Sequence, residues 1–263
     1  MSANSLEPRT SKFKAEQGRS VKEFFDQQAS YYSEFYDETT KTGAAVLFQM
    51  RQHFATALLS GEGRGHLLDL ATGSGHITRT IADAYSAERL HLNDISTLML
   101  DTCRHVFADH PLSTGIEWSN EDAFALLDQL GETRYSVILC LGLIAHTGRL
   151  EDLLSKAYKA LNSGGVLLIQ SSLSDNPGAW LTAALAKSNL RRRPYKLSSY
   201  QLSQLLGAAT ANGFEIAGMR RFGICLPFGD RLLGRWNYRL EAAFAANISR
   251  RGGEVVLKLR RPH

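Results

Sequence analysis

Two aspartates and two glycines in the first half of the chain have types and spacing that suggest ligand chemistry. The stretch Leu67–Thr78 reads LLDLATGSGHIT and places Asp69 just before a loop that contains Gly73 and Gly75. Glycines in such a loop let the backbone approach a ligand closely. Asp94 follows Gly73 by 21 residues, at the end of the next predicted strand. A carboxylate there can accept hydrogen bonds from ribose hydroxyls.

The loop departs from the pattern that binds a dinucleotide. Such a loop reads G-x-G-x-x-G and holds a pyrophosphate, whereas Ala71 stands at the first glycine position here and Thr78 at the third. The carboxylate of Asp69 would also repel a pyrophosphate. The residues therefore favour a ligand with a ribose, little phosphate and a cationic end, and S-adenosylmethionine combines these features.

Short apolar runs alternate with helical patterns through the middle of the chain. This alternation predicts a parallel sheet built from right-handed βαβ units, whose ligands lie at the carboxyl ends of the strands. The predicted strands are 66–70, 90–93, 115–118, 135–140 and 166–170, and the predicted helices between them are 76–85, 96–108 and 150–161.

The ends of the chain add helices and two further strands. Ser20 and Glu23 fit a capping box and predict a helix start, with residues 1–19 outside it, and a second helix covers 43–59. After the fifth strand we expect helices at 179–188, 198–212 and 230–248, and strands at 214–222 and 254–259. The expected fold is α/β, with a doubly wound, mostly parallel seven-stranded sheet, an antiparallel last strand, an N-terminal helical lid and a C-terminal helical insertion.

Five segments in order now suggest a family. The segments LLDLATGSGHIT, LHLNDISTLML, IEWSNEDAF, YSVILCLGLIAH and LEDLLSKAYKALNSGGVLLIQ resemble the successive motifs of class I S-adenosylmethionine-dependent methyltransferases. The resemblance covers roughly residues 64–172 and is strongest to the branch that methylates small molecules, including quinone-type and antibiotic-type enzymes. It implies a lid over residues 1–60, a Rossmann-like domain over 61–263, and segments that cover the acceptor at about 173–212 and 225–250.

The resemblance also implies which residues bind the cofactor. It implies that Asp94 holds the ribose, that Ile95 lies beside the adenine and that Asp122 binds the adenine amino group. The same acids also suit helix caps or turns, so both interpretations stay open. The residues that it assigns to S-adenosylmethionine are Asp69, Ala71, Gly73, Gly75, Asp94, Ile95, Asp122, Ala123 and Leu141.

Four side chains are candidates for the methionine end and the reaction. His146 follows the fourth strand and suits a general base because its pKa is near neutral, although a histidine that only positions the acceptor is the alternative. A lid tyrosine in similar proteins can reach the methionine carboxylate, and Tyr31 and Tyr36 are both candidates for this contact. We assign Tyr31 to catalysis and Tyr36 to cofactor binding, and Tyr32, on the apolar face, to the core. Arg51 suits the methionine carboxylate, an acidic acceptor or solvent.

The C-terminal third is basic. Residues 1–175 carry 15 Lys and Arg against 22 Asp and Glu, whereas residues 176–263 carry 15 against 4. We expect Arg191, Arg192 and Arg193 to grip an anionic acceptor, such as a carboxylate, phosphate or carrier-bound acyl chain; a solvated face is the alternative. The helix 230–248 would cap an apolar acceptor, rest on a membrane surface or pack on the sheet. Little aromatic interleaving accompanies the basic run, which argues against nucleic acid.

Composition narrows the class further. The chain has 263 residues, 44% of them hydrophobic, which excludes a disordered chain. No apolar run reaches the ~18 residues of a membrane span, and the polar N-terminus lacks a signal pattern. Three scattered cysteines indicate reduced thiols without metal-ligand spacing. We therefore expect a cytoplasmic protein that uses no metal.

Together these observations predict S-adenosylmethionine-dependent methylation of a small metabolite, on oxygen, in secondary metabolism. Methylation on nitrogen or carbon is an open alternative. A nicotinamide-dependent oxidoreductase fits less well, because the third glycine is missing and Asp69 is acidic. A catalytically silent cofactor-binding protein is the alternative from another class. The sequence leaves the acceptor and the oligomeric state open.

Overall fold

A computed structural model describes residues 7–36, 43–131, 135–176, 195, 197–223 and 252–263, with side chains described from residue 20 onward except at 43 and 44. The expected helices at 179–188 and 230–248 lie outside these residues, as do Arg191, Arg192 and Arg193 and much of the two expected covering segments. None of the helices described is long and apolar enough to cross a bilayer.

The sheet has seven strands and confirms the expected class. The strands are β1 (His66–Asp69), β2 (Arg89–Asn93), β3 (Glu117–Ser119), β4 (Tyr135–Leu141), β5 (Leu161–Ser172), β6 (Glu215–Phe222) and β7 (Glu254–Arg260). Their order is β3-β2-β1-β4-β5-β7-β6, and β7 runs antiparallel to both of its neighbours. From β1 the chain adds β2 and β3 on one side of the sheet, and it then adds β4 and β5 on the other side of β1. A ligand crevice forms where the strand order reverses in this way, here between β1 and β4.

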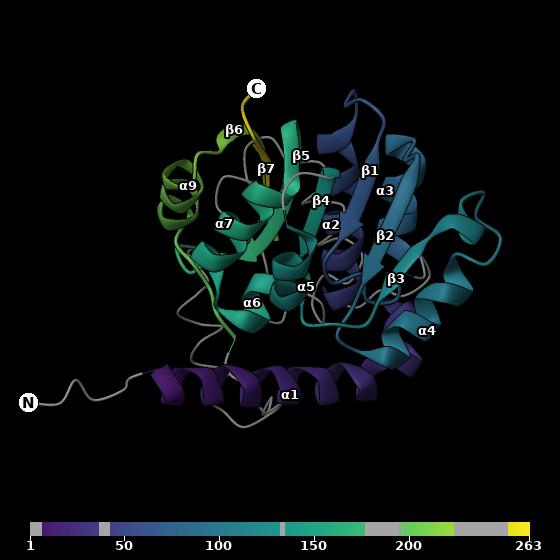
Figure 1. Ribbon diagram of the computed structural model, residues 1–263, viewed down its shortest axis with the longest axis horizontal. Helices are drawn as coiled ribbons and strands as arrows, with labels where there is room; N and C mark the ends of the chain where they lie inside the picture. Colours follow the sequence, from purple (N-terminus) through teal and green to yellow (C-terminus); the bar gives the residue numbers. More distant parts are fainter. Residues whose placement is uncertain (1–6, 37–42, 132–134, 177–194, 196, 224–251) are drawn as a thin grey trace, which may run out of the picture.

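Helices cover both faces of the sheet and one of its ends (Figure 1). Side chains alternate along each strand, so Leu67 joins the core under α2 and α3 whereas Leu68 joins the core under α5, α7 and α9. The helices described are α1 (Glu7–Tyr32), α2 (Gly43–Leu59), α3 (His76–Tyr85), α4 (Thr97–Val106), α5 (Ala123–Leu130), α6 (Leu143–Thr147), α7 (Leu150–Ala160) and α9 (Leu202–Ala211), with 3-10 turns η1 (Ser33–Tyr36) and η2 (Ser113–Gly115).

Helix α1 lies across the end of the sheet where the parallel strands finish (Figure 1). It is attached there by Asp26, whose carboxylate accepts hydrogen bonds from Ser96 Oγ and from Lys22 Nζ, both at 2.6 Å. Ser96 is also the N-cap of α4 and accepts the backbone N–H of Met99. The N-terminal helix is therefore fixed to the turn that follows β2.

Several predicted boundaries are wrong. The first helix begins at Glu7, so Ser20 lies inside it and forms no capping box; residues 7–19 are rich in good helix formers, which apolar periodicity does not detect. The third strand begins at Glu117, because 113–115 form a 3-10 turn. The fifth strand begins at Leu161 rather than at Val166, so it includes Gly164 and Gly165. The helix expected at 198–212 begins at Leu202, since Tyr200 bridges to Leu173.

Candidate active site

Asp69 organises the glycine loop from beneath. Its Oδ2 accepts a hydrogen bond from Thr78 Oγ1 at 2.5 Å, and its Oδ1 accepts the backbone N–H of Ala71 at 3.1 Å. Burial raises the pKa of Asp69 to about 7. The carboxyl group is buried and does not line the cavity described below. Asp69 therefore shapes the loop that faces a ligand, whereas Ala71 lines the cavity itself.

Asp94 joins the glycine loop to the end of β2. Its Oδ2 accepts the backbone N–H of Gly73, and its Oδ1 accepts the backbone N–H of Ser96, both at 2.8 Å. Only 6% of the residue is exposed, yet it lines the cavity. The two N–H groups hold the carboxylate in one orientation, in which its remaining lone pairs can accept ligand hydroxyls.

Gly75 packs the loop against α4. It has a positive φ of 83°, and a Cβ atom there would overlap the Sγ atom of Cys103. Gly75 does not line the cavity, whereas Gly73, with a φ of 54°, does. The two predicted glycines therefore differ: Gly73 faces the ligand side and Gly75 permits close packing behind the loop.

A large cavity of about 1070 Å³ opens beside this loop. Sites for one small molecule typically measure ~300–1,000 Å³, so this volume lies just above that range and suits two ligands side by side. The cavity is lined by α1, η1, α2, the glycine loop and the carboxyl ends of β2, β4 and β5, together with the start of β7. Of the predicted site residues, those that line it are Tyr31, Arg51, Ala71, Gly73, Asp94, Ile95, Asp122, Ala123, Leu141 and His146.

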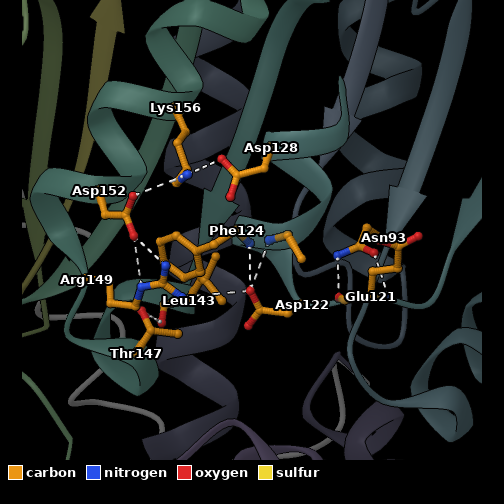
Figure 2. Close-up of polar contacts among 11 residues, drawn as sticks. Asn93, Glu121, Asp122, Phe124, Asp128, Leu143, Thr147, Arg149, Asp152 and Lys156 are labelled. Carbon is orange, nitrogen blue, oxygen red and sulfur yellow. Dashed lines mark hydrogen bonds and ion pairs between the residues drawn. The ribbon is translucent and has the colours of Figure 1, made fainter. Parts of the chain in front are cut away.

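Asp122 serves as a helix cap and as part of the cavity wall. Its Oδ1 accepts the backbone N–H groups of Phe124 at 3.0 Å and Ala125 at 3.2 Å (Figure 2). The guanidinium of Arg149 lies 3.5 Å from the centre of the Phe124 ring and 3.9 Å from Asp122 Oδ1. Phe124 itself is buried in the core. Both interpretations of Asp122 are thus compatible with its position.

The lid tyrosines are arranged differently from the expectation. Tyr32, which we assigned to the core, lies over the loop, because a Cβ atom on Gly73 would be 3.7 Å from its ring. Tyr31 lines the cavity edge and is 38% exposed. Tyr36 does not line the cavity and stacks on His76 at a centroid distance of 4.9 Å. The tyrosine nearest the glycine loop is therefore Tyr32.

His146 lies on the short helix α6 and faces the lid. Its Nδ1 is 2.8 Å from the hydroxyl of Tyr195, and its ring packs on Phe25 at 5.0 Å between centroids. Phe25 also contacts Tyr32. His146 is therefore held in an aromatic cluster that joins α6 to α1.

The sequence did not identify the polar residues at the far end of the cavity. Gln170 and Ser172 on β5 and Glu254 on β7 line it together with Arg51. The available signal was the polar ending of the buried strand, VLLIQSS, in which Gln170 directly follows four apolar residues and Ser172 comes two residues later. A glutamate 82 residues later in the chain has no sequence link to that strand.

Comparisons with known proteins agree with this geometry. Residues 68–167 match the family described as a methyltransferase domain. This match lies within the stretch that resembles the motifs of class I S-adenosylmethionine-dependent methyltransferases and agrees with that resemblance.

Two kinds of relatives are similar over longer stretches. The ubiquinone/menaquinone biosynthesis C-methyltransferase UbiE of Desulfotalea psychrophila is 27% identical over 153 residues, which is 58% of each chain. The putative methyltransferase in a complex with the Haloferax volcanii Trm112 activator has a TM-score of 0.63 and 16% sequence identity. The match covers 91% of this chain and 98% of the chain of that methyltransferase. The [4+2]-cyclase SpnF also has a TM-score of 0.63, with 14% sequence identity, and the match covers 92% of this chain and 95% of the SpnF chain. The two structural likenesses show the fold.

The described residues fit S-adenosylmethionine. Gly73 leaves room beside the loop, since a Cβ atom there would meet only Tyr32 within 4 Å. The carboxylate of Asp94 is held by two backbone N–H groups and has lone pairs left that ribose hydroxyls would fit, and Ile95 and Ala123 add apolar lining to the same cavity. Within the part of the chain that is described, the buried Nε of Arg51 has no hydrogen-bond partner and lines the same cavity, where an anionic group could satisfy it.

The charge state of Asp94 should make cofactor binding depend on pH. Burial raises the pKa of Asp94 to about 6, and ribose hydroxyls favour its ionised form, so ligand binding should expel the proton. We expect the affinity for S-adenosylhomocysteine to be about 10-fold weaker at pH 5 than at pH 7.5, because about a tenth of the carboxyl groups are ionised one unit below the pKa. Calorimetry across this range measures the effect, and a constant affinity would contradict it.

Proposed function

We propose that this protein transfers a methyl group from S-adenosylmethionine to an oxygen atom of a small, largely apolar acceptor. The observation that carries the proposal is the large cavity, whose lining includes the Asp94 turn, the carboxyl ends of β4 and β5, the rings of Phe25 and Phe48, and several polar side chains. Its volume suits a cofactor and an acceptor together. The residues 1–60 would act as the lid.

The residues of the chain would divide the work. Asp94 would hold the ribose, Asp122, Ile95 and Ala123 the adenine, and Arg51 the carboxylate. When bound, S-adenosylmethionine supplies an electrophilic methyl group on a sulfonium. The protein then has to align the acceptor and exclude water, and α1 with its aromatic side chains covers the cavity for that purpose. Arg191, Arg192 and Arg193 would bind an anionic group of the acceptor, such as the phosphate of a carrier-bound acceptor.

His146 would take the acceptor proton. We expect His146→Ala to lower turnover about 100-fold, in the range for a lost general base, and to leave the affinity for S-adenosylhomocysteine unchanged. The exposed His105 offers a matched control, because it lies on α4 away from the cavity. Unchanged turnover in His146→Ala would remove this residue from the mechanism.

Methylation at carbon is a second candidate, favoured by the similarity to a curated C-methyltransferase. A base beside the acceptor serves either atom, since both phenolate oxygens and enolate carbons attack after loss of a proton. Transfer of labelled methyl to a panel of phenols and hydroquinones, followed by fragmentation of the product, would distinguish the two.

Calorimetry with S-adenosylhomocysteine tests the cofactor directly. Binding is expected, together with no response to NADH. Uptake of NADH without uptake of S-adenosylhomocysteine would overturn the proposal in favour of an oxidoreductase. Cofactor binding without methyl transfer to any acceptor would favour a catalytically silent protein.

A further inference from the structure

The far end of the cavity carries a polar cluster that spans two neighbouring strands. Glu254 begins β7 and pairs in the sheet with Ser172 of β5. Its carboxylate accepts hydrogen bonds from Ser172 Oγ at 2.8 Å and from Gln170 Nε2. The three side chains therefore form one connected group, and all of them line the cavity.

Two buried atoms next to this group lack partners. Among the described residues, Gln170 Oε1 and Arg51 Nε make no hydrogen bond, and Gln170 is only 1% exposed. Both residues flank the turn after β4, because a Cβ atom on Gly142 would be 3.4 Å from Arg51 Nη1 and 3.8 Å from Gln170 Oε1. A buried polar atom without a partner costs free energy, so a ligand that supplies the missing partner gains affinity.

This cluster lies far from the nucleoside end. The strand β7 is four places from β2 in the sheet, which corresponds to about 19 Å at ~4.8 Å per strand. A ligand with its ribose at Asp94 and its adenine beside Ile95 and Asp122 would leave this end of the cavity free. The cluster is therefore on the side left for the acceptor.

The chemistry of the cluster selects a hydrogen-bond donor without net charge. Glu254 and the free Oε1 of Gln170 both accept hydrogen bonds. Arg51 lies beside the cluster and its positive charge acts on Glu254, which disfavours a cationic ligand; burial nevertheless keeps the pKa of Glu254 above its ordinary value. The rings of Phe25 and Phe48 line the same cavity and suit an apolar body.

We propose that Glu254 and Gln170 form the acceptor subsite, and that it binds an uncharged hydroxyl or amine hydrogen carried on an apolar ring. The proposal rests on the proposed function, since it places the acceptor beside the cofactor. Glu254 and Gln170 are positioning residues in this role: they receive a hydrogen from a polar group of the acceptor other than the one that His146 deprotonates, and so fix the orientation of the ring.

Binding of small probes to protein saturated with S-adenosylhomocysteine tests the subsite without turnover. The probes are phenol, aniline and anisole, which share a ring, and only anisole lacks a donor hydrogen. Dissociation constants come from ligand-observed NMR titration. We expect phenol or aniline to bind the wild type at least about 10-fold more tightly than anisole, in line with a hydrogen bond to a charged acceptor. Whichever of phenol and aniline binds more tightly shows whether the subsite prefers a hydroxyl or an amine group.

Variants locate that preference. Glu254→Gln keeps the shape of the side chain and should reduce the preference to below about 3-fold, as should Gln170→Met, which leaves β7 untouched. Glu215→Gln, on the exposed start of β6, should preserve it. All three should bind S-adenosylhomocysteine with the wild-type affinity.

The opposite results are equally clear. Phenol and aniline binding no more tightly than anisole, or not binding at all, would overturn the subsite, as would a preference that survives in both variants. If the wild type takes up S-adenosylhomocysteine in these experiments, the proposed function stands while the subsite fails. A wild type that takes up none would overturn both.

Discussion

Asp94→Asn should weaken the binding of S-adenosylhomocysteine by about 100-fold, as expected for lost hydrogen bonds to a charged group. Both carboxylate oxygens of Asp94 accept backbone N–H groups, one from Gly73 and one from Ser96. An asparagine must turn its NH₂ group toward one of these two donors. The substitution therefore removes the charge that holds the ribose and also disturbs the loop that faces it.

A matched control separates these effects from a general loss of charge. Asp101 lies exposed on α4 and pairs with Arg104, so Asp101→Asn should bind S-adenosylhomocysteine as the wild type does. Calorimetry of both variants, with circular dichroism to confirm folding, is the measurement. An Asp94→Asn protein with an affinity within about 3-fold of the wild type would refute the assignment of the ribose site.

Gly75→Ala should lower the free energy of unfolding by about 3 kcal/mol. The positive φ of Gly75 costs an alanine roughly 1–2 kcal/mol, and a new methyl group forced into a packed core costs roughly 1–3 kcal/mol more. The overlapping atom is Sγ of Cys103, on the buried face of α4. Urea unfolding of the variant and the wild type measures the difference.

The double variant Gly75→Ala/Cys103→Ala distinguishes the two costs. Removal of the sulfur relieves the overlap but not the backbone strain, so the double variant should be more stable than the sum of the single changes predicts. If the changes in unfolding free energy are strictly additive, the alanine side chain at position 75 and the side chain of Cys103 do not interact.

The sequence predicted the sheet well because its strands are buried on both faces. Apolar runs such as 135–140 are interrupted by glycine loops and helical periods, and these local signals fix where β4 and its neighbours lie. The first helix was harder to place. Its first part has no apolar stripe, and its start at Glu7 depends on helix propensity that periodicity does not measure.

The site divides in the same way. Asp94 and Gly73 follow one another within 21 residues, at the ends of adjacent strands, so their meeting could be anticipated. Tyr32 was assigned to the core because it lies on the apolar face of its helix, yet that face covers the cavity. Glu254 was missed because its partners Gln170 and Ser172 come from β5, and only the antiparallel pairing of β7 brings them together.

The hydrogen bond between Asp26 and Ser96 has a thermodynamic consequence. Ser96 donates its backbone N–H to Asp94 and its hydroxyl hydrogen to Asp26 of α1. One residue therefore connects the proposed ribose site to the N-terminal helix. If this hydrogen bond couples the two segments, a ligand that steadies the Asp94 turn favours the seated position of α1. By reciprocity, a seated α1 then raises the affinity for that ligand by the same factor.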